Sequence, residues 1–364
     1  MTEEPKATSK HSLCGYAWTD VCSSLQRSIG ISDMTRAQRW AAELVCSDLG
    51  LGRLEALLFD TWAIHVGSTF PGWPRMWYDT IKQLRALWSK SGGDIKAVRN
   101  TPIIRQLVAE AVANLVLVQK RPIPTLPTAS DCFRESEAVR SRIRSGGGAG
   151  DQLVTRRIWT AQLDGDDLKT IGNELEASIK TNQIHRTLFW VIWFFTLETQ
   201  KGAPHAKERG PASLPIKQRK SILWFLVELL KELAKDSVYL SADDRNAQFD
   251  LLELTWVKLG SKGRKECIVT IALSIQEHIA KKSTLALNNA TPLPDPNAIR
   301  SVVSAIDVVY SGIAEEAKKF VLEAPVMVGL TKEGAAQANA ITKKPTQFTS
   351  KDKLALSYSL LSSS

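Results

Sequence analysis

The sequence predicts an all-α protein, and three observations support this class. Apolar residues recur every three to four positions through most of the 364 residues. Long runs of alternating apolar and polar residues, which are typical of half-buried strands, are absent. Eleven tryptophans fall mostly inside the periodic stretches, where large aromatic side chains act as buried anchors. We therefore expect two related multi-helix units joined by a linker rich in proline, glycine and arginine.

The first helical unit spans residues 13–121 and follows a flexible N-terminus at residues 1–12. Its first helix can end at Gly30, and Ser32 or Asp33 can cap the second. Apolar stripes at helical spacing predict five helices. The stripes are Val21, Leu25, Ser28 and Ile29; Ala37, Trp40, Ala41, Leu44 and Val45; Leu51, Leu54, Leu58 and Trp62; Ile81, Leu84, Leu87 and Trp88; and Ile103, Ile104, Leu107, Val108, Ala111, Val112 and Leu115.

A linker is expected at residues 122–157, before a second unit at 158–330. The linker contains three prolines, several arginines and the glycine run 146–150, where a regular helix is unfavourable. Residues 331–364 are small, polar and weakly patterned. We interpret them as a flexible tail or a segment that folds only against a partner.

The second unit restarts the helical pattern with Leu168, Ile171, Leu175 and Ile179 on one face. The segment 184–195 that follows is apolar nearly all round, which predicts a central buried helix in which Trp190 is more buried than Trp40. A polar stretch at residues 199–216, with several glycines and prolines, predicts a surface loop. Further helices are expected at 222–233, 241–260 with a stop at Gly260, 268–279 and 298–321.

A shift of 150 residues aligns part of the first unit with part of the second. The five identical pairs are Leu25 and Leu175, Ser28 and Ser178, Ile29 and Ile179, Arg36 and Arg186, and Trp40 and Trp190. A Trp-Thr pair precedes each copy, at Trp18 and Trp159, with spacers of different length. The match predicts that one helix pair occurs twice, and repeated helical units usually build interaction surfaces.

The net charge of +9 favours an acidic partner, and nucleic acid is the most common one. The surplus is spread along the chain, because residues 1–150 carry 19 basic and 14 acidic side chains and the remainder carries 28 and 24. A distributed surplus of this size also occurs in proteins that bind no polyanion. Nucleic acid is therefore an expected partner, whereas a membrane is not.

Basic residues gather in three groups, two of which we select as candidate nucleic-acid contacts. Arginines near glycines can follow a phosphate backbone, but the same residues can also form a solvated, partly self-paired segment. A third group, Lys262, Arg264 and Lys265, would support the assignment only if all three groups share one face. The candidate contacts are Arg140, Arg142, Arg144, Arg156 and Arg157 in and beside the linker, and Lys217, Arg219 and Lys220 before the helix at Ile222.

No motif in the chain predicts catalysis, a cofactor or a metal. The phosphate-binding loop and the Gly-x-Ser-x-Gly motif are absent, and the five histidines lack metal-ligand spacing. Asp164, Asp166 and Asp167 fit the first turn of a helix better than a cation site. Five widely spaced cysteines without a Cys-x-x-Cys pair favour a reducing compartment. We expect a soluble intracellular protein of the nucleus, cytoplasm or virion, and no enzyme.

Several short motifs follow one another through about a hundred residues of the first unit. They are Trp18-Thr19-Asp20-Val21, Ser24 to Ile29, Arg36 with Trp40 to Ser47, Arg53-Leu54, and the segment from Leu115 to Arg121. In this order they resemble the helical C-terminal region of the RarA/MgsA family of clamp-loader-like ATPases. In that family the region is a collar through which subunits oligomerise at the replication fork.

Departures from the family pattern limit what this resemblance implies. The ATPase module is missing, Gly30-Ile31 replaces paired arginines, and Phe59-Asp60-Thr61-Trp62 stands where an acidic stretch is expected. The resemblance therefore implies assembly and an association with DNA replication or repair, without ATP hydrolysis. The alternative is a viral nucleoprotein or virion structural protein that binds nucleic acid.

Overall fold

The computed structural model describes residues 11–47, 50–94, 97, 101–128, 130–131, 141, 148–200, 203–236, 241–280 and 293–323. Every regular element in these ranges is a helix, apart from one isolated bridge between His11 and Ala17. The prediction of an all-α fold is confirmed. The expected tail at 331–364, and all but the end of the expected flexible N-terminus, lie outside the described residues.

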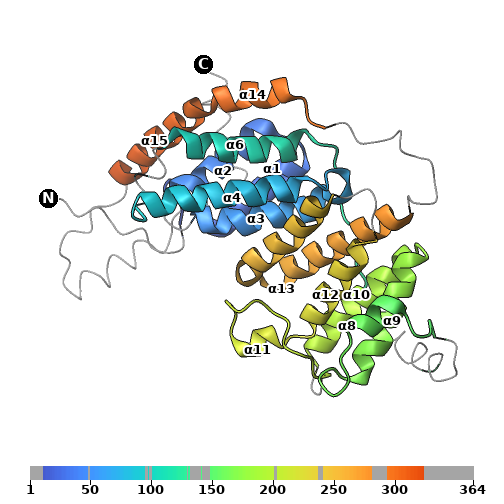
Figure 1. Ribbon diagram of the computed structural model, residues 1–364. Coiled ribbons are helices and arrows are strands. Elements are labelled where there is room, and N and C mark those ends of the chain that lie inside the picture. Colours follow the sequence, from blue (N-terminus) through green and yellow to red (C-terminus); the bar gives the residue numbers. More distant parts are fainter. Residues whose placement is uncertain are drawn as a thin grey trace, which may run out of the picture.

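The first lobe is a bundle of the N-terminal helices (Figure 1). Helix α2 contacts α1, α3 and α6, and α4 contacts α3 and α6. Trp62, Trp73 and Trp77 are fully buried in this bundle. The elements of the first lobe are α1 (Trp18–Gly30), α2 (Met34–Cys46), α3 (Gly50–His65), the short 3₁₀ helix η1 (Gly67–Thr69), α4 (Trp73–Lys90) and α6 (Pro102–Leu117).

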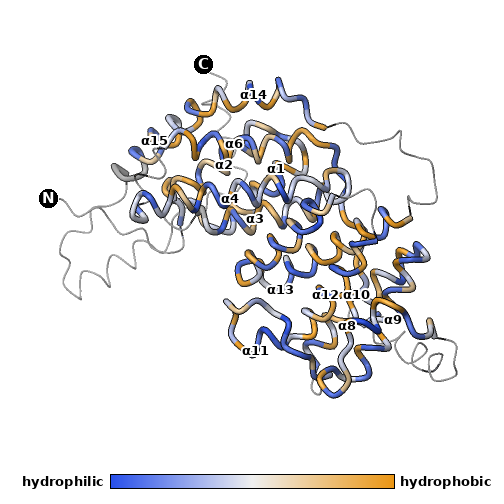
Figure 2. Tube along the Cα trace, viewed as in Figure 1, coloured by the Kyte–Doolittle hydropathy of each residue, from blue (hydrophilic) through white to orange (hydrophobic). Residues whose placement is uncertain are grey.

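The second lobe is built around α10, whose apolar side chains are nearly all buried. Figure 2 shows many hydrophobic residues along α10 and α12 and a hydrophilic segment around α11. Trp190 is 3% exposed and Trp40 is only half-buried, so the predicted difference between them is confirmed. The elements of the second lobe are α8 (Leu153–Ile158), α9 (Asp166–Lys180), α10 (Ile184–Glu198), α11 (Ile216–Arg219) and α12 (Leu223–Ala234).

Helix α8 lies inside the stretch predicted as linker. Val154 and Thr155 are buried, and the buried carboxylate of Glu176 on α9 accepts their backbone N–H groups at 3.0 and 2.7 Å. A carboxylate at this position satisfies donors at the start of a helix that have no partner within it. The linker prediction therefore ends too late, because a contact from α9 orders residues that composition alone left irregular.

Helix α13 (Ala242–Ala280) connects the two lobes. It contacts α3 and α4 of the first lobe and α9, α10 and α12 of the second. At Gly260 the backbone leaves the helical conformation, with φ 64° and ψ −177°. This conformation is essentially restricted to glycine, which is why the sequence signal at Gly260 marked a helix end.

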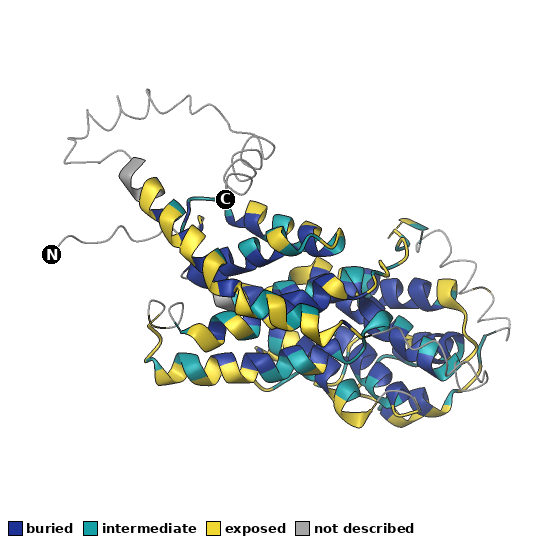
Figure 3. Ribbon diagram, turned by 90° about the horizontal axis from the view of Figure 1, so that it is seen from above, coloured by how far each residue is buried: buried dark blue, intermediate teal, exposed yellow. Residues whose placement is uncertain are grey.

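Helices α14 (Pro296–Ser304) and α15 (Ile306–Glu323) form an arm that returns to the first lobe. Helix α14 contacts α6, and α15 contacts α2 and α6. Figure 3 shows the outer side of the arm exposed. The predicted second unit at 158–330 included these residues, so the structure differs from the predicted grouping. Helical periodicity shows that a helix has an apolar face but does not identify the surface that covers it.

The helix pair predicted to occur twice has the same local geometry in both copies. At a shift of 150 residues the end of α1 matches the end of α9, and the start of α2 matches the start of α10. Ser32 and Asn182 occupy equivalent turn positions with φ of 59° and 56°. The next N–H in each turn donates to the carbonyl of Ser28 or Ser178 at 2.8 Å in both cases. This bond is typical of a helix ending with a left-handed residue.

The surroundings of the two helix pairs differ. Trp40 makes an edge-to-face contact with Tyr16 at 5.3 Å, whereas Trp190 makes one with Phe189 at 4.9 Å. Gly30 is the last residue of α1 and approaches His65, where an added Cβ would lie 2.8 Å from the imidazole ring. The two matched tryptophans therefore do not share one environment, although their helix pairs share ends and turn geometry.

Candidate nucleic-acid interface

The described candidate contacts all lie on the second lobe. Arg156 and Arg157 are exposed on α8, and Lys217 and Lys220 are exposed in and after α11. Arg219 is half-buried. Figure 1 shows α8 and α11 in the lower lobe. The other candidate contacts, Arg140, Arg142 and Arg144, lie outside the described residues.

Arg209 joins α8 to the segment that carries α11. Its guanidinium donates to the carbonyl of Ile158 at the end of α8, at 2.9 Å, and to both carboxylate oxygens of Asp164 at 2.6 Å. Its backbone N–H donates to the carbonyl of Arg219 at 3.0 Å. The first and second basic groups are therefore linked through one buried arginine. Sequence reasoning missed this role, because Arg209 is an isolated basic residue in a loop rich in glycine and proline.

Asp164 holds Arg209 in place as a buried counter-charge. Burial opposes ionisation of this carboxyl, but hydrogen bonds from Arg209 and from the backbone N–H groups of Lys207 and Thr160 lower its pKa below the ordinary value. Glu228 also accepts from Arg209. The acidic cluster before α9 thus acts in folding, and within the described residues no group of three potential ligands is placed to hold a metal.

Two tryptophans whose rings meet at a tilt, Trp224 on α12 and Trp256 on α13, connect α11 to α13. Trp224 Nε1 donates to the carbonyl of Gln218 at 3.0 Å, and its ring lies 4.2 Å from that of Trp256. The guanidinium of Arg264, in the third basic group, lies 4.9 Å from the Trp256 ring. Such a contact between a cation and an aromatic ring is attractive. A chain of direct contacts therefore links the second and third basic groups.

The absence of a side chain at Gly210 lets its backbone pack closely against Arg219 and Trp224. An added Cβ at Gly210 would lie 2.7 Å from Arg219 Cα and 2.7 Å from Trp224 Nε1. Glu198 reaches the same region, because it accepts the backbone N–H of Ile222 at 3.2 Å and acts on Arg264, where it opposes the lowering of the pKa that burial causes. The second and third basic groups thus each place one residue, Arg219 and Arg264, near the start of α12.

The basic residues differ in how far carboxylates neutralise them. Arg219 pairs with Glu208 at 2.8 Å, and Arg156 reaches Asp151 only at 4.0 Å. Arg157, Lys217 and Lys220 are exposed and make no ion pair with any residue that the structure describes. We call these three residues the unpaired cations. A phosphate is attracted most strongly to positive charges that no nearby carboxylate neutralises.

The tryptophans, which the sequence predicts to be buried anchors, offer little exposed ring surface for stacking on bases. Those on the predicted apolar stripes are either buried or half-buried among other side chains. Trp224 and Trp256, which contact the second and third basic groups, are 2% and 1% exposed, and Trp159 at the end of α8 is half-buried. Stacking on bases requires an open ring face. The chemistry of this surface therefore favours phosphates over bases.

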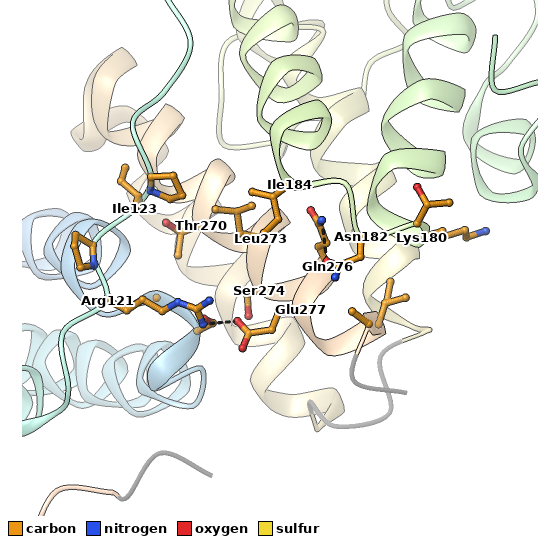
Figure 4. A pocket seen from close by; sticks show the side chains of 17 residues that line it. Arg121, Ile123, Lys180, Asn182, Ile184, Thr270, Leu273, Ser274, Gln276 and Glu277 are labelled. Carbon is orange, nitrogen blue, oxygen red and sulfur yellow. Dashed lines mark hydrogen bonds and ion pairs between the residues drawn. The ribbon is translucent and has the colours of Figure 1, made fainter. Parts of the chain in front are cut away.

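A separate groove lies where the two lobes and α13 meet (Figure 4). Its volume is about 650 Å³, within the range of small-molecule sites. Arg121 and Glu277 form an ion pair of 2.8 Å at its side, and the side-chain amides of Gln276 and Asn182, in the turn between α9 and α10, lie 3.1 Å apart. The hydroxyl of Ser274 is buried and has no hydrogen-bond partner among the described residues. The lining contains no nucleophile held by a base.

No protein-family model, curated protein or solved structure matches this chain. The resemblance to the collar of clamp-loader-like ATPases therefore rests on the residues quoted above. Within the described residues, no helix is both long enough and apolar enough to cross a membrane.

Proposed function

We propose that this protein is a non-enzymatic accessory protein of DNA replication or repair that oligomerises and contacts nucleic acid through its basic residues. The observation that carries the nucleic-acid part is the set of unpaired cations on α8 and around α11. These elements are joined by Arg209 and packed against Trp224. The association with replication or repair, and with oligomerisation, rests on the collar resemblance.

The expected mode of binding is electrostatic and independent of sequence. Each lysine or arginine that neutralises a phosphate releases a counterion, so binding weakens as salt rises. Phosphate contacts position a protein on nucleic acid without reading bases, and Trp224 and Trp256 are buried. We therefore expect similar affinities for unrelated sequences of equal length.

The first experiment measures the fluorescence anisotropy of a labelled oligonucleotide at about 50 and 200 mM salt. The variant replaces the unpaired cations: Arg157→Gln, Lys217→Gln and Lys220→Gln. We expect this variant to bind at least roughly tenfold more weakly than the wild type. The slope of log affinity against log salt should become shallower by about 2 for a single strand, because each lost phosphate contact removes about 0.7 from it.

The matched control removes three exposed lysines elsewhere, so that the change in net charge is equal. We choose Lys82→Gln and Lys90→Gln on α4 and Lys318→Gln on α15. This control should retain nearly wild-type affinity and slope. Equal losses in both triple variants, or no binding by the wild type at about 50 mM salt, would refute the nucleic-acid part of the proposal.

Light scattering separates this proposal from the nucleoprotein alternative. A collar-like accessory protein should form a small closed oligomer without nucleic acid. A nucleoprotein should instead form long assemblies that grow with the length of the added strand. A strict monomer, with and without the oligonucleotide, would contradict both.

A further inference from the structure

The arm formed by α14 and α15 packs on the first lobe, although α13, which precedes it, contacts both lobes. Helix α13 ends at Ala280, beside the groove that borders α9 and α10. The arm then contacts α2 and α6 (Figure 1). It therefore contacts a surface made by residues about two hundred to three hundred positions earlier in the chain, as its hydrogen bonds show.

One face of α15 makes the apolar part of this contact. The face consists of Ile306, Tyr310, Ile313 and Ala317, spaced by four, three and four residues, and all four are buried. This spacing places them on one side of a helix. By contrast, α14 buries none of its side chains fully. Docking of the arm therefore depends mainly on α15.

Ion pairs at both ends of this face fix its register. Near one end, Arg105 on α6 pairs with Asp307 at 2.9 Å and lies 4.7 Å from the Tyr310 ring. Near the other, Glu316 accepts from the Tyr16 hydroxyl at 2.5 Å and from Arg39 at 2.7 Å. Such paired ends make the site selective for this helix in this orientation.

The surface that receives α15 belongs wholly to the first lobe and the residues just before it. Its polar contacts come from Cys14, Tyr16, Arg39 and Arg105. The arm of any copy of this chain presents the same complementary residues. Fifteen residues, 281–295, separate α13 from α14 and can span at most roughly 50 Å when extended. Local concentration decides between a site on the same chain and one on a neighbour.

We propose that the arm is the self-association element of this protein, and that α15 of one copy docks on α2 and α6 of a second copy. This inference deepens the oligomerising half of the proposed function and is independent of the nucleic-acid half. Reciprocal exchange between two copies gives a closed dimer with twofold symmetry. One-way exchange gives a ring or a filament.

A charge-swap experiment on full-length chains tests the proposal. One variant carries Arg105→Glu and the other carries Asp307→Arg. In each variant alone, the contact between positions 105 and 307 then brings together two acidic or two basic side chains, whether it forms within one chain or between two identical chains. In a mixed dimer with exchanged arms, both contacts bring opposite charges together. The chains are mixed, concentrated and examined by native mass spectrometry, with one chain isotope-labelled. We expect mixed dimers at several-fold above the statistical proportion.

The chain with both substitutions is the control for folding, and it should associate like the wild type. Monomers at every concentration would overturn the proposal. Mixed dimers in only the statistical proportion would also overturn it, because the dimer would then form through another surface. Oligonucleotide anisotropy on the same samples separates the two halves of the function. Loss of dimers with retained binding refutes only the exchange of arms.

A second variant tests the same contact without charge. Cys14 Sγ lies 3.6 Å from the carbonyl oxygen of Ile313, so Ile313→Cys places a second thiol near it. Oxidised glutathione can then join the two sulfurs, with its own disulfide reduced. A covalent dimer that increases with protein concentration supports exchange, and a purely intrachain disulfide at all concentrations refutes it. Adding Cys14→Ser should abolish both products.

Discussion

A shared proton between Asp60 on α3 and Glu266 on α13 should make the stability of the protein depend on pH. The two carboxyl groups meet where α13 packs on α3. Asp60 Oδ1 and Glu266 Oε2 are buried, and neither accepts a hydrogen bond from another group among the described residues. Two ionised carboxylates only accept hydrogen bonds, so contact between them requires one proton. Gln26 donates to the other oxygen of Asp60 at 2.9 Å.

The direction of the pH effect follows from the pKa of Glu266. Burial first, and then the charge of Asp60, raise this pKa from 4.5 to about 7, while Lys262 and Lys265 oppose the increase. Burial also raises the pKa of Asp60. Between about pH 4.5 and 7 the folded state binds more protons than the unfolded state, so the free energy of unfolding decreases as pH rises. The full displacement corresponds to about 3 kcal/mol as an upper bound.

The substitution Glu266→Gln tests this reasoning, because the amide keeps a neutral donor beside Asp60 at every pH. We expect the variant to lose most of the pH dependence and to exceed the wild type by about 1–3 kcal/mol near pH 8. Chemical denaturation from pH 5 to pH 8 measures both quantities. The control is Glu315→Gln, an exposed residue of α15. Parallel curves for wild type and Glu266→Gln would refute the shared proton.

Two further predictions concern packing in the second lobe. Arg209→Met leaves the carboxylate of Asp164 buried without its cation and should lower the free energy of unfolding by about 3–5 kcal/mol, measured by denaturant titration. The exposed control Arg156→Met should cost less than about 0.5 kcal/mol. Trp190→Ala should lower the free energy of unfolding by about 3–5 kcal/mol, and Trp40→Ala, at a half-buried position, should lower it clearly less. Thermal unfolding measures both changes. Equal decreases in the two variants would contradict the assigned burial.

Local features of the fold were predictable because they depend on neighbouring residues. Asp33 caps α2 through its side chain, at 3.0 Å from the backbone nitrogen of Arg36, as its position before an apolar stripe predicts. The repeated turn and the break at Gly260 are similarly local. In each case residues close together in the sequence determine the backbone conformation or the cap, so the amino-acid pattern predicts it.

Contacts between distant segments were not predictable from the pattern. The carboxyl groups of Asp60 and Glu266 meet on two helices that the sequence separates widely. Arg209 is an ordinary loop residue until the fold places Asp164 beside it. The basic groups are separate in the sequence, and contacts through Arg209 and Trp224 link them in the fold. A periodic pattern gives the apolar face of a helix and leaves its partner open.

The repeated helix pair does not create two independent domains, because α13 contacts both lobes on each side of Gly260. Before the break, Lys258 pairs with Glu55 of the first lobe at 2.6 Å, while Trp256 packs on the second. After the break, Thr270 donates to Ala63 at 2.8 Å, and the side chain of Gln276 contacts the turn of the second lobe. Separating the lobes would therefore uncover buried surface on both.

The arm differs from α13 in this respect, because its described helix contacts are confined to the first lobe. Its release would expose one apolar face of α15 and its receiving surface on α2 and α6, but would leave the contacts of α13 with both lobes in place. The arm is therefore the part of the described chain that can exchange partners while the two lobes stay joined. A polyanion bound at the unpaired cations would then meet the second lobe of each copy, and assembly through the first lobe would bring several such surfaces to one strand.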